Sequence, residues 1–276
     1  MIGEMSSFQE FIELQLIRGR AYFSKKDALD ELRLSPETFQ VAAARLKKRG
    51  LLVSPRRGFY LILRPEDRSL GAPDPARWID PLMKHLGLDY RVSLLRAAAF
   101  HGSAHQAAMV FQVIAPRQIP KINVGRQRVE FLYKSPTGFA ASNRPEWLAQ
   151  LKTDAGFAKV AGVELTLLDI CRYYHRAAGI NGAAQAVHDL GKKANPRTLA
   201  KAASAYENSA VRRLGYLLER FGHDRQASAL EVLAEKAKSF KELDPAVKPI
   251  VAALSEGDEK NRKWRLVINV PVEIDA

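Results

Sequence analysis

The sequence predicts an α+β protein in which a small N-terminal domain of helices and a hairpin precedes a larger domain of strands and helices. Three observations support this class. Helical periodicity ending in strand-like segments fills the first part, further strand-like runs follow it, and a series of helical patterns occupies most of the second half. Residues 63–78 combine prolines, a glycine and mixed charge, as linkers do. We therefore expect one domain at residues 1–70 and another at residues 71–276.

The first two helices of the N-terminal domain are predicted from apolar spacing and from a capping signal. The segment SFQEFIELQLI has mainly helical apolar spacing, and AYFS after it is a short strand-like link. Ser24 then caps a second helix over KKDALDEL. Asp27 stands three residues later, where it serves as the acidic partner of a capping box.

A third helix and a hairpin complete this domain. Ser35 followed by proline is a strong helix start, and the helix runs to about Arg49 and stops at Gly50. The strand formers in LLVS and GFYLIL flank PRRG, whose proline and glycine suit a tight turn. Helix, helix, helix and hairpin in this order predict a winged helix-turn-helix.

The third helix has an apolar side and a mixed side. Phe39, Ala42 or Ala43, and Leu46 recur at three and four residues, so this stripe should face the core. The opposite side begins with small and polar residues and ends with bases, namely Thr38, Gln40, Val41, Ala44, Arg45, Lys47 and Lys48. Such a helix suits a major groove at its first turns and DNA phosphates at its last.

Individual roles follow from side-chain chemistry. Gln40 and Thr38 can contact base edges, whereas Ala44 or Val41 can contact a thymine methyl group.

The tip of the hairpin carries Arg56 and Arg57, from which a wing reaches the adjacent groove or backbone. The alternative is that bases at a helix end offset the macrodipole and arginines on a turn are merely solvated. DNA contact is favoured, because these basic runs converge on one edge and no acidic residue lies between Glu37 and Glu66.

Bulk composition supports a nucleic-acid partner. The formal net charge is +13, which draws a protein towards nucleic acid or anionic lipid. A membrane is the weaker choice, because the sequence has no membrane-length apolar run and no strongly amphipathic basic helix. The N-terminal segment lacks the features of a secretory signal, so we expect a cytoplasmic protein. The single cysteine, Cys171, excludes an intrachain disulfide and is expected to be a small buried hydrophobe.

The larger domain is predicted to be mixed, with a helix-rich C-terminal half. WIDPLMKHLG and YRVSLLRAAAFHG are helical, MVFQVIAP and RQRVEFLYK are strands, and helices follow from VELTLLDICRYYHRAAG to SAVRRLGYLLERFG before a final strand in WRLVINVPVEID. Its first basic stretch offers additional backbone contacts through Arg117, Lys121, Arg126 and Arg128, and bases at residues 192–225 form a second. These stretches are either solvated faces or contacts to DNA backbone or RNA.

The sequence offers no catalytic or metal-binding constellation. His101 and His105 have a spacing found in zinc sites, but the glutamate of the common zinc motif is absent and Gly102 interrupts the helix. A pair of close carboxylates for magnesium is also absent between Asp89 and Asp154. Glu164 and Asp169 do not share a helix face well enough for acid–base work. We predict no enzyme activity, no cofactor and no metal.

The two parts together resemble a known family, the AbiEi-type antitoxins and transcriptional regulators of bacterial abortive-infection, type IV toxin–antitoxin systems. The basic winged domain carries part of the resemblance. More specific are YRVSLLRAAAFHGSAHQAAMVFQVIAP, VAGVELTLLDICRYYHRAAGINGAAQAV and the terminal WRLVINVPVEID.

The resemblance implies a two-domain autorepressor. Its winged domain would bind inverted repeats in its own promoter, and its C-terminal antitoxin domain would antagonise a nucleotidyltransferase-like toxin without a stable complex. Missing magnesium carboxylates fit the antitoxin role rather than the toxin role. Two alternatives stay open: an RNA-binding or RNA-processing protein, and a protein-interaction adaptor whose winged domain has lost DNA binding.

Overall fold

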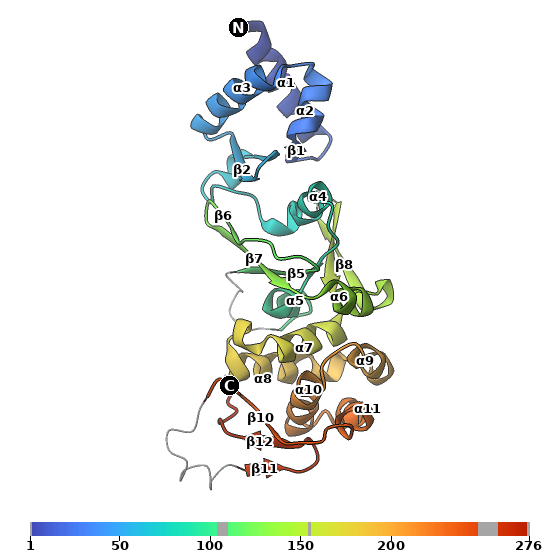
Figure 1. Cartoon of the computed structure of the whole chain (residues 1–276). Coiled ribbons are helices and arrows are strands. Elements are labelled where there is room, and N and C mark those ends of the chain that lie inside the picture. The colour runs from blue at the N-terminus through green and yellow to red at the C-terminus, as the bar shows by residue number, and fades with distance from the viewer. Residues whose placement is uncertain (1, 104–109, 154–155, 248–258, 275–276) are drawn as a thin grey trace. The chain divides into compact units, whose positions relative to one another are not determined.

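A computed structural model describes residues 2–103, 110–153, 156–247 and 259–274 of the chain (Figure 1). The chain forms two compact units, and segments of both alternate along the sequence. Unit 1 comprises Met1–Tyr90, Met109–Tyr133 and Gln150–Lys159, and unit 2 comprises Arg91–Ala108, Lys134–Ala149 and Val160–Ala276. The predicted mixed α+β class is confirmed. The domain boundary near residue 71 stays a prediction.

The first part of unit 1 has helices and strands in the expected order. The elements are α1 (Ile2–Ile17), β1 (Tyr22–Ser24), α2 (Lys25–Leu32), α3 (Pro36–Lys48), β2 (Leu52–Arg56) and β3 (Phe59–Ile62). The strands form an antiparallel sheet in the order β1-β3-β2. Its apolar face and the three helices enclose a core that includes Phe8, Phe23, Phe39 and Leu46.

The capping residues predicted from the sequence determine where two of these helices begin. Ser24 Oγ accepts a hydrogen bond from the Asp27 backbone N–H at 3.1 Å, and Asp27 accepts one from the Ser24 N–H, so the capping box is present. Ser35 Oγ accepts from the Thr38 N–H at 3.2 Å at the start of α3. Ala43, rather than Ala42, is the buried member of the α3 stripe.

The rest of unit 1 contains a short helix and a second small group of strands. The chain passes through two 3₁₀ turns (Pro65–Asp67 and Pro75–Arg77) into α4 (Ile79–His85). Later segments add β5 (Phe111–Ala115), β6 (Ile122–Val124) and β7 (Gln127–Tyr133). In this group β7 pairs in parallel with β5 and antiparallel with β6, so the order is β6-β7-β5. The strands β5 and β7 were expected, whereas β6 was not.

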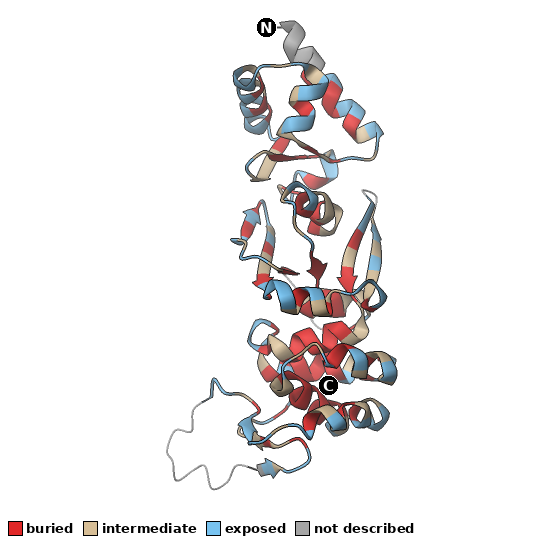
Figure 2. Ribbon diagram, turned by 45° about the vertical axis from the view of Figure 1, so that its right-hand side comes forward, coloured by how far each residue is buried: buried red, intermediate tan, exposed pale blue. Residues whose placement is uncertain are grey.

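Unit 2 is rich in helices. After β4 (Arg91–Val92) its helices are α5 (Leu94–Phe100), α6 (Pro136–Ser142), α7 (Val163–Arg172), α8 (Gly179–Leu190), α9 (Pro196–Ala203), α10 (Asn208–Arg220) and α11 (Asp224–Ala234). Buried residues are dense on α7, α8 and α10 (Figure 2). The helix predicted over residues 90–102 begins only at Leu94, because its first residues pair as β4 with β9.

The remaining strands are short. The chain crosses between the units within β8 (Leu148–Thr153) and β9 (Gly156–Ala161). Near the C-terminus, β10 (Lys241–Glu242), β11 (Glu259–Asn261) and β12 (Leu266–Ile268) form a sheet in the order β10-β12-β11. The final strand predicted from WRLVINVPVEID is therefore present but shorter than expected. None of the described helices is both long and apolar enough to cross a membrane.

Candidate functional site

The residues predicted to contact DNA from the third helix lie on one solvent-facing side of α3. We call this side the α3 surface, and it consists of Thr38, Gln40, Val41, Ala44, Arg45, Lys47 and Lys48. Six of these residues are exposed and Thr38 is half-buried. Val41 is an apolar side chain with 52% of its surface exposed. The opposite side of the helix, through Phe39, Ala43 and Leu46, is in the core.

Two members of the α3 surface already have contacts within the protein. The Thr38 hydroxyl lies 3.1 Å from Ser35 Oγ, so it participates in the helix cap. Lys47 Nζ lies 5.0 Å from the centre of the Tyr60 ring, a cation–π arrangement that holds the ammonium group at the end of α3. Gln40 and Lys48 are exposed on either side of Ala44. The face therefore changes from polar and apolar groups to basic groups along the helix.

The β2–β3 hairpin is the segment predicted to be a wing, and we call it the wing after that prediction. It places the two adjacent arginines, Arg56 and Arg57, in different surroundings. Arg56 donates a hydrogen bond from Nη2 to the carbonyl oxygen of Pro120. Burial accordingly lowers the pKa of the Arg56 guanidinium from its ordinary value. Arg57 is exposed, and only its carbonyl oxygen faces His85, whose Nε2 lies 3.3 Å away. Of the pair, Arg57 has the side chain available to solvent.

The four bases predicted as additional backbone contacts also belong to unit 1. Arg117 lies in the segment after β5, Lys121 precedes β6, Arg126 is in the turn between β6 and β7, and Arg128 is on β7. All four are exposed. The residues predicted to contact DNA from α3, from the β2–β3 hairpin and from the first basic stretch are therefore all in unit 1, whereas the second basic stretch, residues 192–225, is in unit 2.

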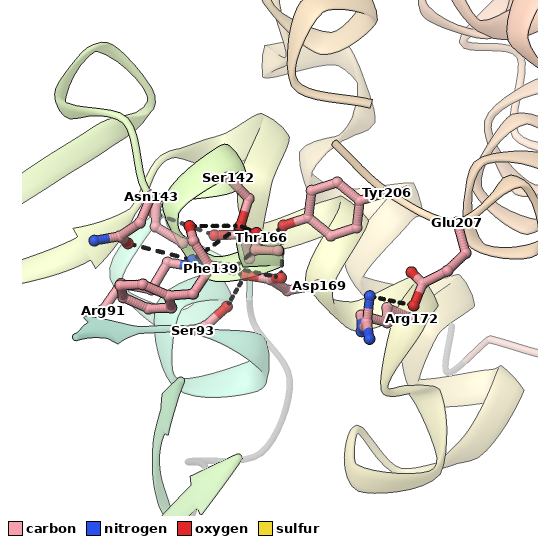
Figure 3. A network of polar contacts seen from close by, with 12 residues as sticks. Arg91, Ser93, Phe139, Ser142, Asn143, Thr166, Asp169, Arg172, Tyr206 and Glu207 are labelled. Carbon is pink, nitrogen blue, oxygen red and sulfur yellow. Dashed lines mark hydrogen bonds and ion pairs between the residues drawn. The ribbon is translucent and has the colours of Figure 1, made fainter. Parts of the chain in front are cut away.

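A second cluster of polar residues lies in unit 2 and is buried (Figure 3). Arg91 on β4 donates to Asp169 on α7 through Nε and Nη2, each at 2.9 Å, in a bidentate ion pair. Both side chains have 0% of their surface exposed. Ser93 Oγ donates to Asp169 at 2.7 Å, and the Tyr206 hydroxyl donates at 2.6 Å. The carboxylate therefore accepts four hydrogen bonds, which satisfies a buried charge.

The same guanidinium reaches a further element. Arg91 Nη1 donates to the side-chain oxygen of Asn143 at 3.2 Å, just beyond the end of α6. Burial by itself raises the pKa of Asp169, but the Arg91 charge and its hydrogen bonds hold that pKa below its ordinary value. Burial and the neighbouring Asp169 charge together raise the pKa of Tyr206 well above its ordinary value. At neutral pH the cluster thus contains an ionised carboxylate and a neutral phenol.

Lys134 lies against this cluster. Its Nζ is 3.7 Å from the centre of the Tyr206 ring, and the side chain is almost wholly buried. This ammonium nitrogen has no hydrogen-bond partner among the described residues. Burial lowers the pKa of Lys134 to about 8. Arg91 and Asp169 are closed off from solvent, and their hydrogen bonds hold β4, α6 and α7 together.

This cluster is not predicted from the sequence, where Asp169 is weighed only as a partner of Glu164. The two carboxylates have different partners, because that of Glu164 accepts from the Asn195 N–H at 2.6 Å. A signal was present, because Asp169 interrupts the apolar run LTLLDIC, and a charged residue in a buried helix face requires a partner. Nothing in the sequence indicates that Arg91 is that partner.

Two smaller predictions concern a cysteine and two histidines. Cys171 is fully buried, as expected, and burial raises the pKa of its thiol to about 12. His101 Nε2 lies 2.7 Å from the carbonyl oxygen of Ala161, whereas His105 is outside the described residues. In the described ranges no group of at least three His, Cys, Asp or Glu side chains could hold a metal ion.

One comparison with known proteins matches the central part of the chain to a protein family. Residues 91–220 match the model of the AbiEi antitoxin C-terminal domain. This range contains all the residues of the buried cluster. The match supports an AbiEi-type antitoxin family for this part of the chain.

One similar solved structure is the crystal structure of the RV2827C protein from Mycobacterium tuberculosis. The two chains are 17% identical, with a TM-score of 0.66, and the similarity covers 93% of this chain and 89% of that one. At this identity the likeness establishes the fold. A comparison with curated proteins finds no match.

Proposed function

We propose that the chain is a sequence-specific DNA-binding autorepressor and the antitoxin of a type IV, abortive-infection system. Residues 1–70 are its winged helix-turn-helix and bind inverted repeats in its own promoter. Residues 71–276 form the antitoxin domain, which antagonises a nucleotidyltransferase-like toxin without a stable complex. It acts in the cytoplasm, without a cofactor and without catalysis of its own.

The observation that carries the DNA-binding part is the α3 surface. The order α1-β1-α2-α3-β2-β3, with a β1-β3-β2 sheet, supports the proposed winged helix-turn-helix, whose third helix would enter the major groove. Here that helix buries its apolar stripe and leaves polar and basic residues exposed. In the major groove, the exposed side chain of Val41 can contact the methyl group of a thymine.

Different residues of the α3 surface then have different roles. Gln40 can contact the edge of an adenine, and Val41 or Ala44 can contact a thymine methyl group. Arg45, Lys47 and Lys48, at the end of the helix, contact phosphates and contribute affinity without sequence preference. Thr38 contributes less to base contact, because its hydroxyl is already bonded within the cap.

The experiment is a salt-titrated binding assay with the duplex that lies upstream of the gene. Removing two phosphate contacts in Arg45→Ala/Lys48→Ala should lower the slope of log K against log salt by about 1.8, since each contact contributes about 0.9. The matched control is Lys236→Ala/Lys238→Ala, which removes the same charge from exposed residues of unit 2. An α3 variant that retains the wild-type slope and affinity would refute this interface.

Sequence preference is tested separately. Gln40→Ala should bind random duplex as the wild type does but should lose much of its preference for the upstream duplex, because base contacts contribute roughly 1–3 kcal/mol each. If the wild type binds single-stranded RNA better than any duplex, the RNA-binding alternative replaces this proposal. If it binds no nucleic acid, the protein-interaction alternative does.

The antitoxin part rests on the family match to residues 91–220. It is tested by co-expressing the chain with a nucleotidyltransferase-like toxin and measuring growth. Full rescue without co-purification of the two proteins is the expected result. If instead the two proteins co-purify and rescue is lost when their complex is disrupted, a stable complex is required and the type IV assignment is wrong.

A further inference from the structure

The β6–β7 hairpin is attached to the N-terminal part of unit 1 by a close backbone contact. The N–H of Arg126, in the hairpin turn, donates to the carbonyl oxygen of Leu70 at 2.7 Å. Gly125 beside it has a positive φ of 54°. A Cβ at Gly125 would lie 2.2 Å from the Leu70 carbonyl oxygen and 2.7 Å from Gly71 Cα. Only glycine permits this approach, so the turn has one docked position.

A second contact attaches the same region to the wing. Arg56 on β2 donates from Nη2 to the carbonyl oxygen of Pro120, which lies shortly before β6. Residues of β2 and β6 are also neighbours in unit 1. The segment that precedes the β6–β7 hairpin therefore contacts the tip of the wing. The side chain of Arg56 serves this internal contact rather than an external one.

These contacts leave a basic face exposed on the hairpin. Ile122 pairs with Val129 and both are buried, so this face of the hairpin packs inward. Asn123 pairs with Arg128 and both are exposed, on the opposite face. Lys121, two residues from Asn123, belongs to the same outward alternation, and Arg126 is exposed at the turn. Lysine and arginine thus predominate on the outward side, and Glu130, two residues from Arg128 on β7, is half-buried.

We propose that the β6–β7 hairpin is a second DNA-contacting element, which binds the phosphate backbone beside the site occupied by α3. The inference rests on the DNA-binding function proposed above. Its partner is duplex DNA, because the hairpin is fixed to the wing and presents bases in unit 1, the unit that also carries the α3 surface. A short hairpin of lysine and arginine contacts phosphates and adds affinity, but it does not add base preference.

The decisive variant removes the outward bases and leaves the docking contacts intact. Lys121→Ala/Arg126→Ala/Arg128→Ala retains the backbone N–H that binds Leu70. If each side chain contacts one phosphate, the slope of log K against log salt falls by about 2.7. At about 0.1 M salt the affinity then falls on the order of 500-fold, equally for specific and random duplex.

The outcomes separate the two proposals. If the wild type binds no duplex, the proposed function is wrong and the hairpin has no such role. If the hairpin variant binds as the wild type does while Arg45→Ala/Lys48→Ala is weakened, the DNA-binding function stands and the hairpin proposal is refuted. Loss of affinity in the hairpin variant but not in Lys236→Ala/Lys238→Ala supports it.

A second variant tests the docking without removing any charge. Gly125→Ala places a Cβ against Leu70 and should displace the hairpin, so the salt slope falls although every base is retained. The control is Gly87→Ala, which also replaces a glycine of positive φ, 66°, but has no atom within 4 Å of the new Cβ. Circular dichroism confirms that both variants fold. A wild-type slope in folded Gly125→Ala would refute the fixed position of the hairpin.

Discussion

Replacing Asp169 with asparagine should destabilise unit 2 severely, although the two side chains have almost the same shape. The aspartate accepts hydrogen bonds from Arg91 Nε and Nη2, from Ser93 Oγ and from the Tyr206 hydroxyl, at 2.6–2.9 Å. Asparagine keeps one oxygen and turns an NH₂ group towards two of these donors. It also leaves the fully buried Arg91 charge without its counter-charge.

The expected cost follows from these losses. Removing one partner of a buried ion pair costs about 3–5 kcal/mol, and most of that cost comes from the buried charge that remains without a counter-charge. For a unit of this size each kcal/mol lowers Tm by roughly 2–4 °C, so Asp169→Asn should melt about 10 °C below the wild type. The folded-state pKa of Asp169 is below its ordinary value, so its contribution is present above about pH 4 and is lost as the pH falls further.

The assay is urea and thermal unfolding of the full chain at pH 7 and at pH 3.5. The control is the exposed ion pair between Arg18 and Glu31, whose side chains are 44% and 38% exposed. Arg18→Gln breaks this pair and should cost below about 1 kcal/mol. The double variant Arg91→Met/Asp169→Leu should be less destabilised than Asp169→Asn, because it strands no charge. A Tm of Asp169→Asn within about 2 °C of the wild type would refute this account of the cluster.

Two further predictions concern unit 2. Lys134→Met should raise the unfolding free energy at pH 7 by about 2 kcal/mol. The lysine pKa of about 8 means that the folded state disfavours the charged form of Lys134, and the contact of its ammonium group with the Tyr206 ring offsets part of that cost. This gain in unfolding free energy should shrink as the pH rises from about 8, where the folded wild type loses the lysine proton, to about 10.4, where the unfolded chain loses it too. A gain that stays constant in urea titrations up to about pH 10.5 would contradict the lowered pKa of Lys134. Gly215→Ala places a Cβ 2.0 Å from the buried Trp264 ring and should cost about 3 kcal/mol, measured as a lower Tm with a red-shifted tryptophan emission. An unchanged Tm would show that the Trp264 ring does not pack on α10 in this way.

The sequence predicts those parts of the fold that depend on near neighbours. Ser24 and Ser35 begin helices because their side-chain oxygens accept from residues three positions later, and this spacing is visible in the sequence. The buried stripe of α3 is likewise a repeat of three and four residues. These features were predicted correctly, and with them the exposed side on which the candidate interface lies.

Contacts between distant residues could not be predicted in this way. Arg91 and Asp169 are 78 positions apart, and Arg56 and Pro120 are 64 apart. No periodicity links such residues, and a lone arginine in YRVSLL is compatible with an exposed position. The same limit explains β6, which is only three residues long and has too few positions to produce an alternating pattern.

The net charge of +13 overstates the basic surface of the molecule. Several bases of residues 192–225, expected as a solvated face or as contacts to DNA backbone or RNA, bind backbone carbonyl groups within unit 2. Arg212 donates to the carbonyl oxygen of Ser239, Arg213 donates to that of Cys171, and Lys193 donates to that of His101. Arg212 and Arg213 are also buried, so neither can reach a phosphate. The α3 surface and the β6–β7 hairpin keep their bases exposed, and a nucleic-acid interface is therefore better argued from unit 1 than from total charge.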